Sequence, residues 1–500
     1  MLEAMGSGLA QVLSWPAFGL MLLGIPIGLI IGAIPGLGGN LGLALLIPFT
    51  YGMNPIQGFC LLLGMHAVVQ TGGPMSSILF NAPGTGPSAA DCLDGFPMAQ
   101  QGKAGRAIGA ALSASVIGGL VGAAGMAIFL PFVRTLILSF SPSEFFMLAV
   151  LGITFISLVS GDSLLKGLIV GALGLMLAFV GMDPQTGVVR FAFGQLFLFD
   201  GISLVPVVIG LFAGSECISM VLKGGSIVEG EAKVGDDVLD GVKDTLRNWW
   251  LVLRSSLIGY IIGVMPGLGG EVSAWVTYGH AAQSSKHPET FGKGNVEGVI
   301  APAAAIHSKE AGALVPTVAF GIPGSSAMAI LLGAFLVLGL TPGPTMLKQN
   351  LDVVWAMFWI VIIANIIGAT ALLLVAKYLT LLTVLRSSLL VPFILVFVML
   401  GSYLTNNTLA DLWITVAFSI IGYAMKKYDY PRAPLVLSLV LGGLAETNFH
   451  MSMELWGPAF LLRPLTFILL LLTVTSIAYP IYRNWRKSQA AAAKAEGGAA

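Results

Sequence analysis

The sequence predicts an all-α, polytopic membrane protein built from two related halves with broken helices or re-entrant hairpins. Hydrophobic residues make up 56% of the 500 residues and charged residues only 10%, well below the fraction of about 25% that is usual in soluble proteins. Apolar stretches of about 20 residues, the length of a spanning helix, recur along the whole chain. Counting them gives roughly 10–14 transmembrane segments, many of which Gly and Pro interrupt.

Composition and motifs also exclude several classes of function. The net charge is zero, so no basic surface indicates nucleic-acid binding. The five histidines and three cysteines have no metal-ligand or disulfide spacing, and we expect no cofactor apart from a coupling ion. The sequence contains no HExxH, GxSxG or GxxxxGK[ST] motif, which argues against an enzyme or an on-chain ATPase. An intramembrane enzyme acting on a lipid or peptide and a channel remain the alternatives to a carrier.

A polar interval divides the chain. It covers residues 223–249, which we expect to form a cytoplasmic loop between a first membrane half at residues 1–222 and a second at residues 250–480. Residues 481–500 form a basic tail. Since positively charged segments remain in the cytoplasm, we place this tail there.

Two pairs of matching motifs relate the halves. Residues 28–40 read GLIIGAIPGLGGN and residues 259–271 read GYIIGVMPGLGGE, 231 positions later. Residues 71–85 read TGGPMSSILFNAPGT, and residues 311–325 read AGALVPTVAFGIPGS, 240 positions later. Such Gly/Pro-interrupted repeats indicate the binding site of a secondary transporter. Whether the repeats are parallel or inverted stays open, because the number of spans in each half is not fixed by the sequence.

The PGLGG motif predicts a break in a helix. Pro lacks the N–H that a helix interior requires, and Gly allows the backbone to leave helical geometry. Broken helices persist in a membrane only inside protein or beside an aqueous cavity. Their N-terminal ends favour anions, and their carbonyl-rich ends suit Na⁺. The alternative is that these glycines only allow helices to pack closely.

The predicted substrate and ion site combines the four motifs. Three of its members, Thr85, Ser325 and Ser326, carry hydroxyls that can bind a carboxylate or a cation, although each can equally bond to its own helix. The complete candidate set is Pro35, Gly36, Gly38, Gly39, Asn40, Pro83, Gly84, Thr85, Pro266, Gly267, Gly269, Gly270, Glu271, Pro323, Gly324, Ser325 and Ser326.

Glu271 is the carboxylate attached directly to a predicted break. It follows the second PGLGG, at the position that Asn40 occupies in the first half. Ionisable residues inside membranes are functional hypotheses by default. Glu271 is therefore a candidate Na⁺ ligand, together with Asn40, or a proton acceptor, unless it merely lies at an interface or at a helix start.

Other ionisable residues have simpler interpretations. Lys309 and Glu310, with His307 close by, are expected to form an ion pair at the membrane interface. Asp91 and Asp94 stand near basic residues and are expected in a solvated turn.

Three segments together resemble the large membrane subunit of the tripartite tricarboxylate transporters, the TctA type. They are the repeated PGLGG, the segment DGFPMAQQGKAGRA at residues 94–107, and a block at residues 291–344. The block contains FGKGNVEGVIAP and KEAGALVPTVAFGIPGSSAMAILLGAFLVLGLTPGP. The likeness in length and hydropathy extends along nearly the whole chain.

This resemblance implies a multi-pass protein of the bacterial inner membrane that takes part in ion-driven uptake. The implied partners are a small four-helix membrane subunit and a periplasmic solute-binding protein. The implied substrates are di- and tricarboxylates or other organic carboxylates, with Na⁺ or H⁺ as the coupling ion.

One departure from the family pattern concerns substrate or coupling. Many members carry a Glu where this chain has Ala303, and an Asn pair where it has Ile306 and His307. Either these positions are peripheral, or this member differs in its substrate or coupling stoichiometry.

Overall fold

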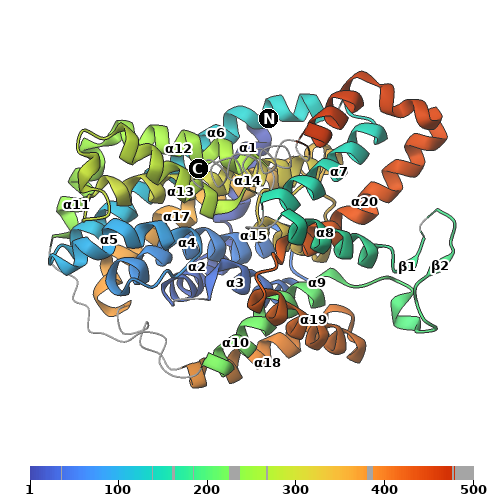
Figure 1. Ribbon diagram of the computed structural model, residues 1–500, viewed down its shortest axis with the longest axis horizontal. Coiled ribbons are helices and arrows are strands. Elements are labelled where there is room, and N and C mark those ends of the chain that lie inside the picture. The colour runs from blue at the N-terminus through green and yellow to red at the C-terminus, as the bar shows by residue number, and fades with distance from the viewer. Residues whose placement is uncertain are drawn as a thin grey trace, which may run out of the picture. The chain divides into compact units, whose positions relative to one another are not determined.

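Helices account for almost all of the secondary structure in the computed structural model (Figure 1). The structure describes residues 1–34, 37–137, 139–159, 164–183, 185–223, 237–265, 268–379, 387–475 and 478. Within these ranges the strands are β1 (Gly181–Met182) and β2 (Val189–Arg190), which pair antiparallel as one short hairpin. The predicted all-α fold class is confirmed.

The chain divides into two units whose boundaries differ from those of the predicted halves. Unit 1 comprises Met1–Leu138 and Ser203–Tyr428, and unit 2 comprises Ser139–Ile202 and Asp429–Ala500. Unit 1 therefore contains all four paired motifs. The boundaries drawn from the sequence repeat, at residues 222 and 250, remain a prediction about relatedness within the chain.

Unit 1 contains most of the helices. In chain order its elements are α1 (Leu2–Leu13), α2 (Ala17–Ala33), α3 (Gly38–Leu46), η1 (Ile47–Thr50), α4 (Pro55–Phe80), η2 (Pro87–Ala90), α5 (Asp91–Gln100), α6 (Ala104–Ile137), α9 (Leu204–Val208), η4 (Ile209–Gly214), α10 (Ser215–Lys223), α11 (Val238–Arg247), α12 (Trp249–Val264), α13 (Gly269–Ser284), η5 (Pro288–Thr290), α14 (Glu297–Phe320), α15 (Ser326–Val337), α16 (Pro344–Gln349), α17 (Leu351–Leu379), α18 (Ser387–Asn406) and α19 (Leu409–Lys427).

Unit 2 has fewer elements, and α20 packs against both α7 and α8. Besides β1 and β2, its elements are α7 (Pro142–Val159), α8 (Leu164–Ala178), η3 (Leu196–Leu198), α20 (Ala433–Trp456) and η7 (Gly457–Leu462).

Fewer helices cross a membrane in one piece than the sequence predicted. The described residues contain four helices of sufficient length and hydropathy, or up to six if two bent pairs each count as one span. Further apolar stretches form helices of 10–17 residues, since Gly and Pro divide them. The predicted 10–14 segments include such interrupted stretches, and this number stays a prediction. The four continuous candidates are Ala104–Ile137, Leu204–Leu222, Leu351–Leu374 and Leu409–Lys427.

Both predicted helix breaks are present. Helix α2 ends at Ala33 and α3 begins at Gly38, while α12 ends at Val264 and α13 begins at Gly269. Gly38 and Gly269 have φ of +66° and +70°, in the left-handed region that favours glycine. Four candidate residues in these breaks lie outside the described part of the chain: Pro35, Gly36, Pro266 and Gly267.

Two long, buried helices, α4 and α14, form the centre of unit 1. Asn54 and Gln57 form a capping box at the start of α4. The two helices end alike, since α4 is followed by Asn81 at φ 53° and α14 by Gly321 at φ 68°. Nearly every residue of both helices is buried, so the polar residues they carry face protein.

Each long helix has a broken-helix partner at very short range. Helix α2 lies along α4, and α12 lies along α14 (Figure 1). A methyl group on Gly32 would overlap the carbonyl oxygen of Val69, and one on Gly263 would overlap that of Lys309. The second pair of residues follows the first by 231 and 240 positions, the offsets of the two sequence motifs. Small residues at such crossings allow close backbone approach.

The polar interval is only partly described. Residues 224–236 lie outside the described residues, but Val238–Arg247 forms α11 instead of the expected loop. Its Asp244 binds Arg106 of α6 with 2.5 Å between the carboxylate oxygen and Nε. This pairing joins the polar helix α11 to the membrane helix α6.

Candidate functional site

The first PGLGG motif meets the second PG motif. Asn40, in the first turn of α3, donates from Nδ2 to Ser326 Oγ at the start of α15, at 3.0 Å. Both residues are partly exposed. The contact joins residues 286 positions apart and brings the two halves together at the beginnings of two helices.

The second PGLGG motif meets the first PG motif in the corresponding way. Glu271, in the first turn of α13, lies with its carboxylate directly beside Gly86, where a methyl group would overlap Oε1. The adjoining Gly270 lies against Pro87, whose Cγ would be 2.6 Å from a methyl group at that glycine. Glu271 is exposed, so its charge is open to solvent or a ligand.

These two contacts are related by the sequence offsets. Position 40 corresponds to 271 with an offset of 231, and position 86 corresponds to 326 with an offset of 240. The break of each half thus contacts the PG loop of the other half. The PG loop of the first half also lies against its own break, at Gly84 and Gly32. The two half-helix starts and the two PG loops therefore belong to one region of unit 1.

The two half-helix starts are uncapped and face open space. No side chain caps the N-terminus of α3 or α13, whereas Ser325 caps α15 by accepting from Met328 N. A methyl group on Gly38 or Gly269 would meet no atom within 4 Å. Free N–H groups and the helix dipole make such ends suited to anions, including carboxylates.

The PG loops fit tightly under the broken helices. A methyl group on Gly84 would overlap the carbonyl oxygen of Gly32, and one on Gly324 would lie 2.8 Å from the carbonyl oxygen of Gly263. Any side chain at these positions would displace backbone. The glycines at 84 and 324 therefore serve close packing, which was the alternative interpretation of the motif glycines.

The hydroxyls of the PG loops differ in their availability. Ser325 is occupied as a helix cap, as the alternative interpretation held. Thr85 is buried, and its Oγ1 has no hydrogen-bond partner. Pro83 is exposed, whereas Pro323 is buried. Thr85 is thus the hydroxyl of the candidate set without a partner, whereas the Ser326 hydroxyl already accepts from Asn40.

Behind the half-helix starts lies a buried ion pair. Lys309 Nζ lies 3.0 Å from Glu310 Oε1, and both side chains are enclosed by protein, at 2% and 5% exposure. The expected ion pair exists, but it does not lie at an exposed interface. The sequence interpretation failed because only the tertiary packing of α14 against α4, α12 and α13 encloses it.

Two residues of α4 that sequence reasoning overlooked complete this cluster. His66 Nε2 lies 3.2 Å from Glu310 Oε2, and Gln70 Nε2 lies 3.5 Å from Glu310 Oε1. They are four residues apart, so they share one face of α4. A polar stripe in an otherwise apolar helix was the available signal, since polar groups inside membrane helices are usually functional.

The neighbouring histidine is engaged elsewhere. His307 Nε2 lies 3.1 Å from Thr71 Oγ1, and its Nδ1 lies 3.0 Å from the carbonyl oxygen of Ala303. Thr71 also contacts Asn365 of α17 at 3.5 Å. Ala303 and Ile306, which depart from the family pattern, are both buried, so these positions belong to the interior next to the ion pair.

The aspartates of α5 are not solvated. Asp91 and Asp94 are both fully buried, and they lie in a helix instead of a turn. Asp94 accepts hydrogen bonds from Gly294 N and Asn295 N, at 2.9 and 2.8 Å, and from the Tyr278 hydroxyl at 2.9 Å. The segment at residues 94–107 and the block beginning at residue 291 therefore meet at Asp94.

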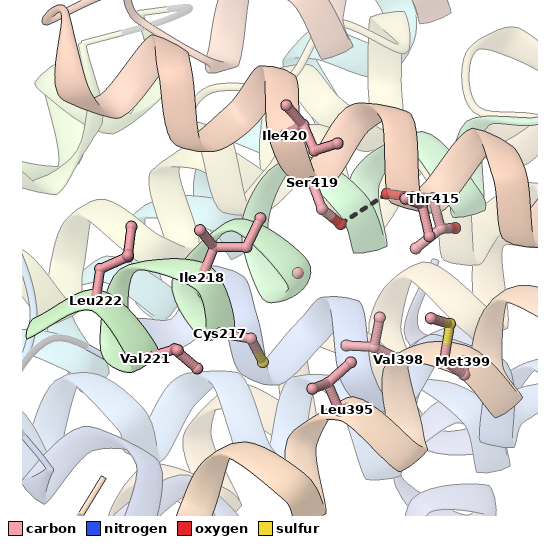
Figure 2. Close-up of a pocket in the computed structure, with 12 residues that line it drawn as sticks. Cys217, Ile218, Val221, Leu222, Leu395, Val398, Met399, Thr415, Ser419 and Ile420 are labelled. Atoms are coloured by element: carbon pink, nitrogen blue, oxygen red, sulfur yellow. Dashed lines mark hydrogen bonds between the residues drawn. The ribbon is translucent and has the colours of Figure 1, made fainter. Parts of the chain in front are cut away.

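A cavity elsewhere in unit 1 has a different character. It holds about 310 Å³ between α10, α18 and α19, and Figure 2 shows its apolar lining, which includes Cys217, Leu395 and Val398. The Ser419 hydroxyl there donates to the carbonyl oxygen of Thr415. The cavity thus offers no group for a carboxylate. Among the described residues no cluster of three His, Cys, Asp or Glu side chains could hold a metal ion.

Comparison with known proteins identifies the family of the chain. The family described as "Tripartite tricarboxylate transporter TctA family" matches residues 18–437. A protein of Agrobacterium vitis, named "Uncharacterized 52.8 kDa protein in TAR-I ttuC' 3'region", is 33% identical over 436 residues, which cover 86% of each chain. A second, named "Uncharacterized protein in TAR-II ttuC' 3'region", is 32% identical over 200 residues, 39% of this chain and 81% of that one. No solved structure matches.

The range that matches the family contains every described residue of the candidate site. The chain is a multi-pass membrane protein that belongs to the tripartite tricarboxylate transporter TctA family.

Proposed function

We propose that this protein is the large membrane subunit of an ion-coupled secondary transporter that imports organic carboxylates, chiefly di- and tricarboxylates. A periplasmic solute-binding protein delivers the substrate, and a small four-helix membrane subunit completes the complex in the bacterial inner membrane. The observation that carries the proposal is the reciprocal contact of each helix break with the other half's PG loop, through Asn40 with Ser326 and Glu271 with Gly86.

The geometry supports an anionic substrate. Two uncapped helix starts, at Gly38 and Gly269, face open space, and each end carries roughly half a positive charge. A di- or tricarboxylate has two or more negative groups to place against two such ends. Backbone N–H groups then bind the substrate without an exposed Lys or Arg in either motif.

The same region supports cation coupling. Glu271 is an exposed carboxylate in the first turn of α13, and Asn40 offers an amide oxygen at the equivalent turn of α3. Carboxylate and amide oxygens are ligands that suit hard cations, and unwound backbone carbonyls of broken helices coordinate Na⁺ in other transporters. A cation at Glu271 also compensates the charge of the carboxylate substrate, and a proton on Glu271 has the same effect.

Unit 1 contains two structural repeats in this proposal. The support comes from equivalent contacts: α2 meets α4 as α12 meets α14, and Gly84 lies beneath Gly32 as Gly324 lies near Gly263. Transporters built from repeats move one part against another around a site at the repeat interface. The crossed contacts between the breaks and the PG loops are the ones that such a movement changes.

The experiment that tests the proposed function is reconstitution of the chain with the small membrane subunit and the solute-binding protein in liposomes. Labelled succinate, citrate and benzoate serve as probes under an inward Na⁺ or H⁺ gradient. Accumulation above the external concentration, dependent on the binding protein, is the expected result. Simple equilibration without saturation indicates a channel, and no movement of any probe contradicts the proposal.

A further inference from the structure

His66 connects the proposed carboxylate site with the buried ion pair. Its Nε2 faces Glu310 Oε2 at 3.2 Å, while its Nδ1 faces α3, since a methyl group on Gly39 would lie 3.0 Å from it. The side chain is 98% buried, and Nδ1 has no hydrogen-bond partner. An unpartnered ring nitrogen is thus directed at the first turn of the half-helix whose start faces open space.

The partner of Nε2 determines the state of Nδ1. Glu310 also receives Lys309 Nζ at 3.0 Å, so it is an ionised carboxylate and can only accept hydrogen bonds. Nε2 must therefore donate. In the neutral imidazole the other nitrogen, Nδ1, then carries a lone pair and no proton. The ring can become a donor toward α3 only by taking up a proton.

Charge counting links that proton to an anion. With neutral His66, the side chains of Lys309 and Glu310 sum to zero, and protonation of His66 raises the cluster to a charge of +1. This added charge would lie beside the positive end of α3, which is unfavourable without a counter-ion. A carboxylate in the open space before Gly38 supplies the missing negative charge, so each stabilises the other.

We propose that His66 is the proton-coupling residue of the carboxylate site. Building on the proposed function, a proton from water binds Nδ1 as the carboxylate binds before Gly38, and it leaves when the substrate leaves. Lys309 has a matching position beside the other half-helix, since its Cδ would lie 3.9 Å from a methyl group on Gly270. Glu310 holds His66 and Lys309 together between the starts of α3 and α13.

The electrostatic surroundings of His66 are defined by α14. Helices α2 and α3 and the short elements η1 and η2, which also pack against α4, contain no ionisable side chain. Four ionisable groups on the other helices packed against α4 are bonded to residues other than His66: Asp94 to Tyr278, Arg106 to Asp244, Asp352 to Gln11, and His307 to Thr71. Asp91 of α5 is buried without a hydrogen-bond partner. Glu310, with Lys309 behind it, is therefore the charged group in contact with the ring.

The test compares His66→Gln and His66→Asn with His307→Gln as a control of equal burial. The glutamine retains a neutral donor toward Glu310 and the asparagine retains one toward α3, but neither takes up a proton. Each protein is reconstituted with both partner subunits, and succinate, citrate and benzoate are the probes. Apparent affinity is measured across about two pH units, and exchange without any gradient is measured beside proton-driven accumulation.

The sign of the pH effect follows from linkage. Wild-type and His307→Gln proteins should bind the carboxylate most tightly at low pH and lose affinity as the pH rises, with a limiting slope of about tenfold per pH unit for one proton bound with the substrate. Both His66 variants should lose this slope and proton-driven accumulation while still exchanging substrate. Proton-driven accumulation that persists in either His66 variant would overturn the assignment.

A measurement on the wild-type protein keeps the assignment testable if the variants fail to fold. In weak buffer, addition of a transported probe to the purified complex should remove one proton from solution per carboxylate bound. Binding without proton uptake overturns the role of His66 and leaves the proposed function intact. Failure of the wild-type complex to exchange any of the three probes contradicts the proposed function itself.

Discussion

Glu271 is the residue on which the proposed Na⁺ coupling depends most. Glu271→Gln keeps the size and one oxygen of the side chain but removes its charge. We expect the half-saturating Na⁺ concentration for uptake to rise about tenfold or more, equivalent to about 1.4 kcal/mol, because the first turn of α13 would lose its one carboxylate. Uptake by reconstituted protein over a Na⁺ series gives this value.

The alternative is that Glu271 only stabilises the helix start, an effect of about 0.3–1 kcal/mol. In that case the variant should melt at a slightly lower temperature and keep its Na⁺ dependence. Asn40→Ala serves as the comparison at the equivalent turn, since it removes an amide and the bond to Ser326 without changing charge. Unchanged cation dependence in Glu271→Gln places the coupling site elsewhere.

Gly84 tests whether the PG loops must pack directly under the broken helices. In Gly84→Ala the new methyl group would overlap the carbonyl oxygen of Gly32, and overpacking of this kind costs about 1–3 kcal/mol. We expect a lower unfolding temperature in detergent and reduced uptake. The control is Gly279→Ala in α13, where a methyl group meets no atom within 4 Å and helix propensity improves by up to about 1 kcal/mol.

The role of a residue could be predicted from the sequence only where the residue belongs to a local motif. Glu271 and Gly38 could be selected because they occupy equivalent places in two matching motifs. His66 and Asp94 could not, because their roles depend on partners far away in the chain, Glu310 and the backbone before α14. Periodicity and motif spacing carry no information about which distant segment a buried side chain meets.

At the scale of elements, Gly38 at the start of α3 tests whether the motif glycine leaves space for a ligand or only allows helices to pack closely. Gly38 has a positive φ and open space before it, so a leucine there would incur about 1–2 kcal/mol of backbone strain and would occupy the proposed anion site. Gly38→Leu, like Gly269→Leu, should reach the membrane and fail in uptake. Gly38→Asn is the control, because Asn tolerates the left-handed region best after glycine.

These variants are compared by membrane fractionation and by uptake. If Gly38→Leu transported as well as Gly38→Asn, the open space before α3 would not be the substrate site, and Gly38 would serve only the positive φ at the start of the helix.

Asp94 fastens two elements of opposite halves. Asp94→Ala removes the acceptor of three hydrogen bonds. Two of them join α5 to the segment before α14, and the third joins α5 to α13. With Gly294 N, Asn295 N and the Tyr278 hydroxyl left without their acceptor, we expect a loss of about 2–4 kcal/mol in unfolding free energy. Asp94→Asn keeps the oxygen that both N–H groups need, and it should lose less. Thermal unfolding in detergent ranks the two variants, and equal stability to wild type contradicts the proposed fastening.

Element types followed from composition and pattern, whereas the number of complete spans did not. The breaks at PGLGG could be predicted because Pro and Gly act on the local backbone, wherever the rest of the chain lies. Whether a broken apolar stretch continues as one bent span or turns back depends on packing between helices. For that reason the bent pair α1 and α2, which meet at 69°, counts as one span or two on structural grounds alone.

At the scale of the whole molecule, the proposed energy source for transport is a cation gradient. The reciprocal contacts of the breaks with the PG loops lie in unit 1, where half-helix starts suited to an anion carry side-chain oxygens suited to a cation. The sequence contains no GxxxxGK[ST] loop with which to hold a nucleotide phosphate. In the proposed function, a carboxylate that accumulates inside the cell is driven by a cation that moves with it.

The corresponding prediction is that uptake depends on a cation gradient and is independent of ATP. In cells or vesicles that hold the complete complex, collapse of the Na⁺ and H⁺ gradients should abolish accumulation of the carboxylate, because the substrate then has no compensating charge and no source of free energy. Depletion of ATP at a preserved gradient should leave the initial rate unchanged. The two conditions must be imposed separately, since cells couple ATP to both gradients, and proteoliposomes without nucleotide provide the clean comparison. Uptake that follows ATP when both gradients are held constant would show that the chain works with a separate motor, and the coupling roles of Glu271 and His66 would then both be wrong.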